Sequence, residues 1–166
     1  STGKISIYCP EGRGINLLSS IYYVSQKPLL LNDTLKDNVL LFGDKFGLDE
    51  EKALLKAIQI TELNSLVDQL GGFDARKLGE SGSGVSGGQG QRIALARAIV
   101  SERPIILLDE ATSALNDELE TAILKWLTSQ EHLTIIAVSH SESIRRWFSK
   151  ELKYSPNDKS FNIAEI

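Results

Sequence analysis

The residues best suited to bind a phosphate group lie at positions 86–89, directly before a helix-forming run. They are Ser86, Gly87, Gly88 and Gln89. A serine and two glycines at the start of a helix leave several backbone N–H groups unpaired at the positive end of the helix dipole. Anions bind readily at such a position. The segment therefore predicts a phosphate site.

A pair of acids, Asp109 and Glu110, follows the apolar run 105–108. A strand that ends in a carboxylate places it where open α/β sheets bind nucleotides and Mg²⁺. Consecutive side chains of a strand point to opposite faces, so the two acids are not expected to form one paired-carboxylate site. We expect Asp109 to hold Mg²⁺, usually through water, and Glu110 to orient or deprotonate an attacking water.

These residues need a scaffold, and the hydrophobic pattern predicts an α/β fold. Short runs of apolar and β-branched residues predict strands, whereas apolar residues three and four apart predict helices. We expect strands at 4–8, 21–24, 105–109 and 134–139, and the main helices at 88–101 and 116–127. The alternation of strand and helix in the second half is typical of a parallel sheet.

The remaining segments are expected to be mainly helical or irregular. The block 32–79 is predicted to be mostly helical, with its third helix beginning at Thr61. Residues 141–150 are also expected to form a helix. Beyond Leu152 the sequence is polar and predicts irregular structure, apart from a weak strand at 161–163.

The bulk properties argue against several classes of protein. With 166 residues, 42% of them hydrophobic, the chain is long enough to bury a core of its own. A formal net charge of −4 argues against a large nucleic-acid surface, which needs a basic face. Cys9 is the single cysteine, so the sequence contains no disulfide framework and no cysteine metal cluster. No run approaches the roughly 18 apolar residues of a membrane helix, and the N-terminus does not resemble a signal peptide.

The two motifs at 86–89 and 105–110 resemble the signature loop and the Walker B strand of an ABC-type ATPase, at the family's spacing. The resemblance covers nearly the whole chain and is to the nucleotide-binding domain of exporter-type ABC transporters. It implies a P-loop NTPase-like parallel sheet with an inserted helical signature subdomain. By this resemblance Gln26 matches the Q-loop glutamine, which reaches Mg²⁺ and the attacking water. His140 matches the H-loop histidine, which contacts the γ-phosphate.

The resemblance also implies two loops that communicate with partners. Ser113, Ala114, Leu115 and Asn116 match the D-loop, except that the family usually has aspartate at the position of Asn116. Glu80 lies in a segment that resembles the exporter X-loop. It would therefore meet a coupling helix of a membrane domain.

The phosphate-cradling P-loop is the family element that these residues lack. Gly3 and Lys4 resemble its end, but Ile5 stands where serine or threonine must hold Mg²⁺. The N-terminal part of the fold is therefore expected to be missing, with the P-loop and membrane helices preceding this segment in a longer polypeptide. Residues 1–166 would form an incomplete ABC ATPase domain, with an α/β core at 1–31 and 102–166 and a mainly helical signature subdomain at 32–101.

The resemblance implies ATP and Mg²⁺ as cofactors, and ATP hydrolysis in a head-to-tail dimer with a second ABC ATPase domain. Hydrolysis would drive a transmembrane transport domain, so the expected location is the cytoplasmic face of a membrane, without nucleic acid as a partner. Alone, the chain is expected to hydrolyse almost no ATP, because it lacks the P-loop. Two alternatives remain. An SMC or DNA-repair type ATPase is disfavoured by the acidic charge and the lack of coiled-coil heptads, whereas a non-catalytic ABC-like module that complements an intact partner stays open.

Overall fold

The computed structural model describes residues 17–41, 50–79, 84–157 and 159–166. In chain order its elements are α1 Leu17–Ser20, β1 Ile21–Val24, α2 Leu35–Leu40, α3 Glu50–Ile60, α4 Asn64–Leu70, α5 Gly87–Val100, β2 Ile105–Asp109, α6 Asp117–Thr128, β3 Thr134–Val138, the 3₁₀ helix η2 Glu142–Trp147, β4 Lys150–Ser155 and β5 Ser160–Glu165. The strand expected at 4–8 lies outside the described residues.

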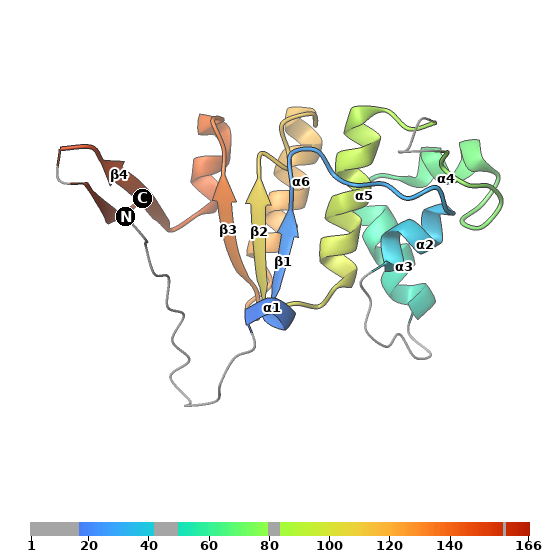
Figure 1. Cartoon of the computed structure of the whole chain (residues 1–166), viewed down its shortest axis with the longest axis horizontal. Helices are drawn as coiled ribbons and strands as arrows, with labels where there is room; N and C mark the ends of the chain where they lie inside the picture. The colour runs from blue at the N-terminus through green and yellow to red at the C-terminus, as the bar shows by residue number, and fades with distance from the viewer. Residues whose placement is uncertain (1–16, 42–49, 80–83, 158) are drawn as a thin grey trace.

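Strands β1, β2 and β3 form a parallel sheet with β2 in the middle. Ile21 of β1 pairs with Ile105 of β2, which pairs in turn with Thr134 of β3. All three arrows point the same way in Figure 1, so the carboxyl ends of the strands meet at the upper edge of the sheet. The predicted α/β fold with a parallel sheet is confirmed.

One face of this sheet carries the hydrophobic core. The period-two alternation of a strand places Tyr22, Val24, Ile106 and Leu108 on the buried face. These side chains form one hydrophobic cluster with residues of α5 and α6. On the opposite face Tyr23 is 56% exposed. Among the described residues the sheet is therefore covered by helices on one side only.

Helices α2, α3 and α4 form a second hydrophobic cluster against α5 (Figure 1). Helix α5 takes part in both clusters: Ala94, Leu95 and Ala98 pack with the sheet, whereas Ile93 and Ala96 pack with the other helices. With 3.6 residues per turn, these two sets occupy different sides of the helix. Helix α5 thus joins the sheet to the helical region. None of the described helices has the length and apolar character needed to cross a bilayer.

The expectations for the C-terminal segment are wrong. Residues 141–150 do not form a continuous helix, because the short 3₁₀ helix η2 ends at Trp147 and Lys150 already begins β4. Strands β4 and β5 pair antiparallel, with Tyr154 opposite Phe161 and their ring centroids 5.1 Å apart. Cross-strand aromatic pairs of this kind stabilise a hairpin. The region beyond Leu152 is therefore a regular hairpin, which contains the weak strand expected at 161–163.

Thr61 does not begin a helix, as the sequence pattern suggested. Its hydroxyl donates to the carbonyl of Ala57 at 2.7 Å, so it belongs to the C-terminal end of α3. The residue before α4 is Leu63, which has no side-chain oxygen to cap the helix. Thr61 and Leu63 are both fully buried, so packing rather than capping decides where α4 begins.

Candidate functional site

The predicted site residues follow the carboxyl ends of the three parallel strands. Gln26 comes two residues after β1, Asp109 ends β2, Glu110 follows it, and His140 comes two residues after β3. The amide nitrogen Nε2 of Gln91 in α5 lies 3.3 Å from the carbonyl oxygen of Gln26 and 3.4 Å from that of Glu110. The loops after β1 and β2 therefore meet at one point beside α5.

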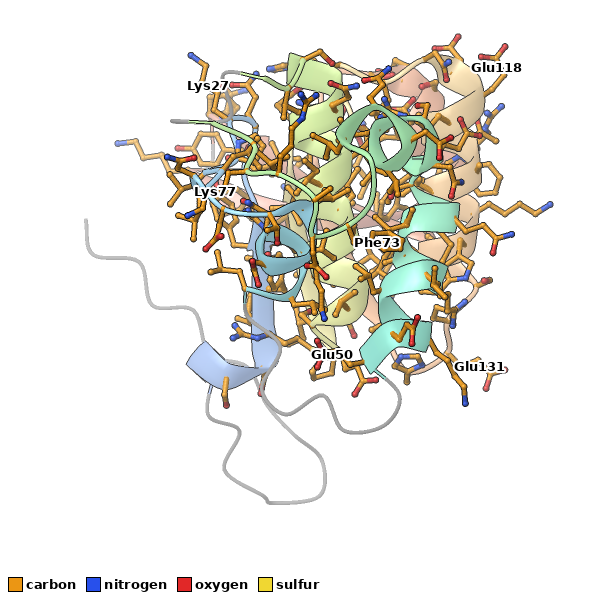
Figure 2. All side chains as sticks on the ribbon, turned by 90° about the vertical axis from the view of Figure 1, so that its right-hand side faces the viewer. Lys27, Glu50, Phe73, Lys77, Glu118 and Glu131 are labelled. Carbon is orange, nitrogen blue, oxygen red and sulfur yellow. The ribbon has the colours of Figure 1, made fainter. Side chains whose placement is uncertain are left out.

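The same end of the molecule carries the start of α6. Figure 2 shows Lys27, directly after Gln26, and Glu118 of the first turn of α6 at the upper end, whereas Glu50 and Glu131 lie at the lower end. Helices that run antiparallel to the strands present their N-termini at the strands' carboxyl ends. The positive ends of these helix dipoles thus face the edge where an anionic ligand would bind.

Glu110 has a backbone conformation that is unusual for a residue with a side chain. Its φ is +51°, in the left-handed region, and its N–H donates to the carbonyl of Val138 at 2.9 Å. The carboxylate oxygen Oε1 accepts a hydrogen bond from the backbone N–H of His140 at 3.1 Å. Such strained conformations cluster at functional sites. The turn after β2 therefore aims the Glu110 carboxylate at the loop after β3.

The His140 imidazole stands in solvent beside this carboxylate. Its Nε2 lies 3.7 Å from Oε1 of Glu110, and its side chain is 98% exposed, against 18% for that of Glu110. Among the described residues, the Glu110 carboxylate is the side chain beside the ring nitrogens. The ring is thus accessible to a ligand at this edge.

Asp109 has a different partner from Glu110. The hydroxyl of Tyr23, on the open face of the sheet, donates to Oδ2 of Asp109 at 2.6 Å. This hydrogen bond to a carboxylate raises the pKa of the Tyr23 phenol above its usual value, because the proton is held between the two oxygens. The two acids thus belong to separate contacts, Asp109 with β1 and Glu110 with the loop after β3.

The loop at 86–89 forms a complete capping box at the start of α5. The N–H of Gln89 donates to Oγ of Ser86 at 3.2 Å, and the N–H of Ser86 donates to Oε1 of Gln89 at 2.8 Å. A serine hydroxyl that accepts in this way keeps its own hydrogen for another acceptor. Ser86 and Gly87 are exposed, so this hydrogen and the first N–H groups of α5 face solvent.

The segment 113–116, which the sequence predicts to be the D-loop, packs directly on this helix start. A Cβ atom added to Gly88 would lie 3.0 Å from the carbonyl oxygen of Ala114, so a side chain at this position would push the Ala114 backbone away from the helix start. This segment contains two turns. The N–H of Ser113 donates to the carbonyl of Glu110, and the N–H of Leu115 donates to the carbonyl of Thr112.

Asn116 ends the D-loop as the N-cap of α6. Its Oδ1 accepts from the N–H of Leu119 at 2.9 Å. Asparagine and aspartate cap equally well, so the departure from the family pattern leaves this local structure intact. Glu80 lies outside the described residues.

Three polar residues of this region are not identified by sequence reasoning. They are Tyr23, Gln91 and Glu120. Glu120 of α6 accepts from the Thr112 hydroxyl at 2.6 Å and from the Ser143 hydroxyl at 2.9 Å, which fixes the segment after His140. Gln91 and Glu120 are both buried, and a polar residue within an otherwise apolar helix face is the signal that points to them.

The residues of this edge fit ATP and Mg²⁺. Within the described part of the chain no three His, Cys, Asp or Glu residues gather to hold a metal ion by themselves. Mg²⁺ in nucleotide sites is bound by one or two carboxylates together with phosphate oxygens and waters. Asp109, on the open face of the sheet, is a donor of this kind, and the N-terminus of α5 supplies donors for phosphate oxygens.

Comparison with known proteins identifies the family. The family model described as ABC transporter matches residues 12–113, a span that includes the loop at 86–89 and the acids after β2. Over 118 residues the chain is 42% identical to the mycobactin import ATP-binding/permease protein IrtB of Mycolicibacterium smegmatis, covering 70% of this chain and 20% of that protein. It is 40% identical over 127 residues to the ATP-dependent lipid A-core flippase of Haemophilus influenzae, covering 75% of this chain and 21% of the flippase.

A solved structure gives the same result. A bacterial Atm1-family ABC exporter with ATP bound matches 81% of this chain and 23% of its own, with a TM-score of 0.72 and 31% identity. The chain spans about a fifth of the length of the curated relatives described above. From the family model and these relatives, we conclude that this chain belongs to the ABC transporter family.

Proposed function

We propose that the chain is part of the ATP-hydrolysing domain of an ABC exporter and works in a head-to-tail pair with a second such domain. The observation that carries this proposal is the convergence of the loops after β1 and β2 beside α5, with Glu110 held by the backbone of His140 after β3. The carboxyl edge of a parallel sheet is where nucleotides bind in open α/β folds. The family membership supports the same reading.

The residues at this edge divide the chemistry among them. Asp109 would hold Mg²⁺, which would neutralise charge on the phosphoryl group that ATP transfers. Glu110 would orient or deprotonate the attacking water, with its carboxylate held in place by the N–H of His140. The exposed His140 ring would donate to the γ-phosphate, and the exposed Gln26 side chain would serve the metal and the water.

The loop at 86–89 acts on ATP bound by the second domain. The Ser86 hydroxyl hydrogen and the first N–H groups of α5 face solvent, so they are available to a phosphate that another chain presents. The 166 residues contain no P-loop, so each complete ATP site takes its phosphate cradle from outside them. The chain by itself therefore turns over almost no ATP.

The remaining parts of the proposal concern organisation and partners. In this proposal the signature subdomain spans positions 32–101, and the α/β core is divided between positions 1–31 and 102–166. Glu80 contacts a transmembrane transport domain, and the assembly lies at the cytoplasmic face of a membrane. The names of the relatives, ATP-binding/permease protein and flippase, support a transport partner.

The test mixes the purified chain with the ATP-binding domain of a bacterial exporter whose own signature serine has been changed to arginine. That domain keeps its P-loop and its catalytic glutamate, so turnover in the mixture requires this chain's loop at 86–89. We expect the chain to raise ATP turnover at least about tenfold and Ser86→Arg to abolish the increase. Ser65→Arg, at an exposed serine of α4, is the matched control and leaves the increase intact.

Glu110→Gln separates this function from non-specific activation. The carboxylate of the P-loop-bearing domain serves the composite site, so this variant keeps the stimulation in trans. An increase that survives Ser86→Arg, or no increase with the unaltered chain, contradicts the proposal.

A further inference from the structure

Gln91 occupies a buried position at which three functional loops meet. Its side chain is in the second turn of α5, and the residue is 4% exposed. Its Nε2 lies 3.3 Å from the Gln26 carbonyl, 3.4 Å from the Glu110 carbonyl and 3.2 Å from Oγ of Ser113. Its Oε1 accepts from the N–H of Ala114 at 2.9 Å. One side chain thus contacts the Q-loop, the turn after β2 and the D-loop.

The neighbours of Gln91 define which end of its amide is nitrogen. The two backbone carbonyls on one side can only accept, and the Ala114 N–H on the other side can only donate. The amide nitrogen has two hydrogens, but three acceptors surround it. At least one hydrogen is therefore shared, and a small displacement of one loop transfers its hydrogen bond to the next acceptor. A buried amide of this kind responds to the position of every loop that it contacts.

We propose that Gln91 is a positioning residue that couples the signature helix to the Glu110 turn and the D-loop. The inference rests on the proposed function for its catalytic meaning. When the start of α5 shifts as it engages a second domain, Gln91 moves with it. Its hydrogen bonds then displace the Glu110 carbonyl and the Ala114 N–H in the same direction. The orientation of the Glu110 turn thus depends on whether the loop at 86–89 is engaged.

A second buried polar residue of α5 shows what a purely structural contact looks like. The Arg97 guanidinium donates from Nη1 to the Leu29 carbonyl at 2.5 Å and from Nη2 to Oδ1 of Asn38 at 2.8 Å. These contacts fix the segment before and within α2, so the hydrogen bonds of Arg97 go to Leu29 and Asn38 rather than to Glu110 or the D-loop. Gln91 differs because all four of its contacts lie in the predicted site.

The first test follows amide hydrogen exchange in the isolated chain, so it does not depend on ATP hydrolysis. Gln91→Met keeps the length and burial of the side chain but removes its hydrogen bonds. We expect exchange of the Ala114 amide to accelerate at least about fivefold, while the amides of 93–100 in α5 are unchanged. Gln59→Met, at an exposed glutamine of α3, is the matched control. An unchanged Ala114 amide, or equal acceleration throughout α5, contradicts the proposal.

Gln91→Glu separates the two ends of the side chain. Glutamate keeps an oxygen that accepts from the Ala114 N–H, but its other oxygen carries one hydrogen at most, against two on the amide nitrogen, so fewer of the Gln26, Glu110 and Ser113 acceptors have a donor. We expect the Ala114 amide to stay protected in this variant. In the mixture the composite site uses the catalytic glutamate of the P-loop-bearing domain, so Gln91 acts there through its contacts with the D-loop. Gln91→Met, which loses both D-loop contacts, should lower kcat at least about threefold with KM unchanged, whereas Gln91→Glu, which keeps the Ala114 contact, should lower it less.

The two arms distinguish failure of the coupling from failure of the proposed function. If the unaltered chain gives no stimulation, the proposed function is wrong. The exchange rate of the Ala114 amide then still tests whether the Gln91 side chain holds the D-loop. If stimulation occurs and Gln91→Met leaves kcat unchanged, the coupling of the signature helix to the D-loop is wrong although the function stands.

Discussion

Replacing Asn38 by alanine tests whether one buried amide holds the segment that carries the Q-loop. Asn38 is fully buried, and its Oδ1 accepts from the N–H of Leu31 at 2.9 Å and from Nη2 of Arg97 at 2.8 Å. Its Nδ2 donates to the carbonyls of Leu31, Asp33 and Thr34 at 2.9 to 3.2 Å. The amide thus closes the loop before α2 and also holds the guanidinium of α5.

The magnitude follows from the groups that alanine would leave without a partner. The Leu31 N–H and one N–H of Arg97 lose their acceptor, and an unsatisfied buried group costs about 1–3 kcal/mol. The guanidinium is already desolvated, which lowers its pKa below the usual range, so water does not readily replace the lost oxygen. We expect Asn38→Ala to reduce the free energy of unfolding by about 3–4 kcal/mol.

Urea unfolding followed by the fluorescence of Trp126 and Trp147 measures this change. With an m-value of about 2 kcal/mol per M, the midpoint should fall by about 1.5–2 M. Asn162→Ala, at an exposed position of β5, is the control and should shift the midpoint by less than about 0.3 M. A loss below about 1 kcal/mol in Asn38→Ala would mean that the Leu31 and Arg97 groups find other partners, and the reasoning would fail.

Two further predictions concern the helix cap and a buried phenol. Ser86→Ala removes the capping-box acceptor and should lower the free energy of unfolding by about 1 kcal/mol, whereas Ser86→Gly should cost only a few tenths, as measured by urea unfolding. Equal losses in the two variants would contradict a capping role. Burial raises the pKa of Tyr22 from 10.0 to about 12, so stability that is full below pH 10 should be lost as the pH rises through 12, by about 2 kcal/mol at pH 12 itself. Tyr22→Phe should lack this loss when urea midpoints are compared at pH 9 and 12, and a parallel decline in both proteins would show that Tyr22 is not its source.

Much of the sheet could be predicted from the sequence because its strands are marked by local apolar runs. The runs at 21–24, 105–109 and 134–138 form β1, β2 and β3, and their ends place Asp109 and Glu110 at one edge. The helix start at Ser86 is likewise local, since both halves of its capping box lie within four residues.

Other parts of the fold depend on contacts that the local pattern does not contain. The segment 141–150 has a helical composition, yet it contains only a short 3₁₀ helix because Lys150 pairs with Glu165 in the hairpin. Thr61 has a side chain that could cap a helix, but it is fully buried at the end of α3, where its hydroxyl donates to the carbonyl of Ala57. Tertiary packing overrides local propensity at both places.

The sequence by itself determined the three strands of the parallel sheet, the helix start at Ser86 and the family motifs, because these depend on residues that are neighbours in the chain. Only the tertiary structure decided that Gln91 joins the three loops, since its partners Gln26, Glu110 and Ser113 lie 65, 19 and 22 residues away. These residues come into contact only when the sheet and α5 pack together. A buried amide then has to find its hydrogen-bond partners among whatever segments the packing brings beside it, because water cannot serve it there.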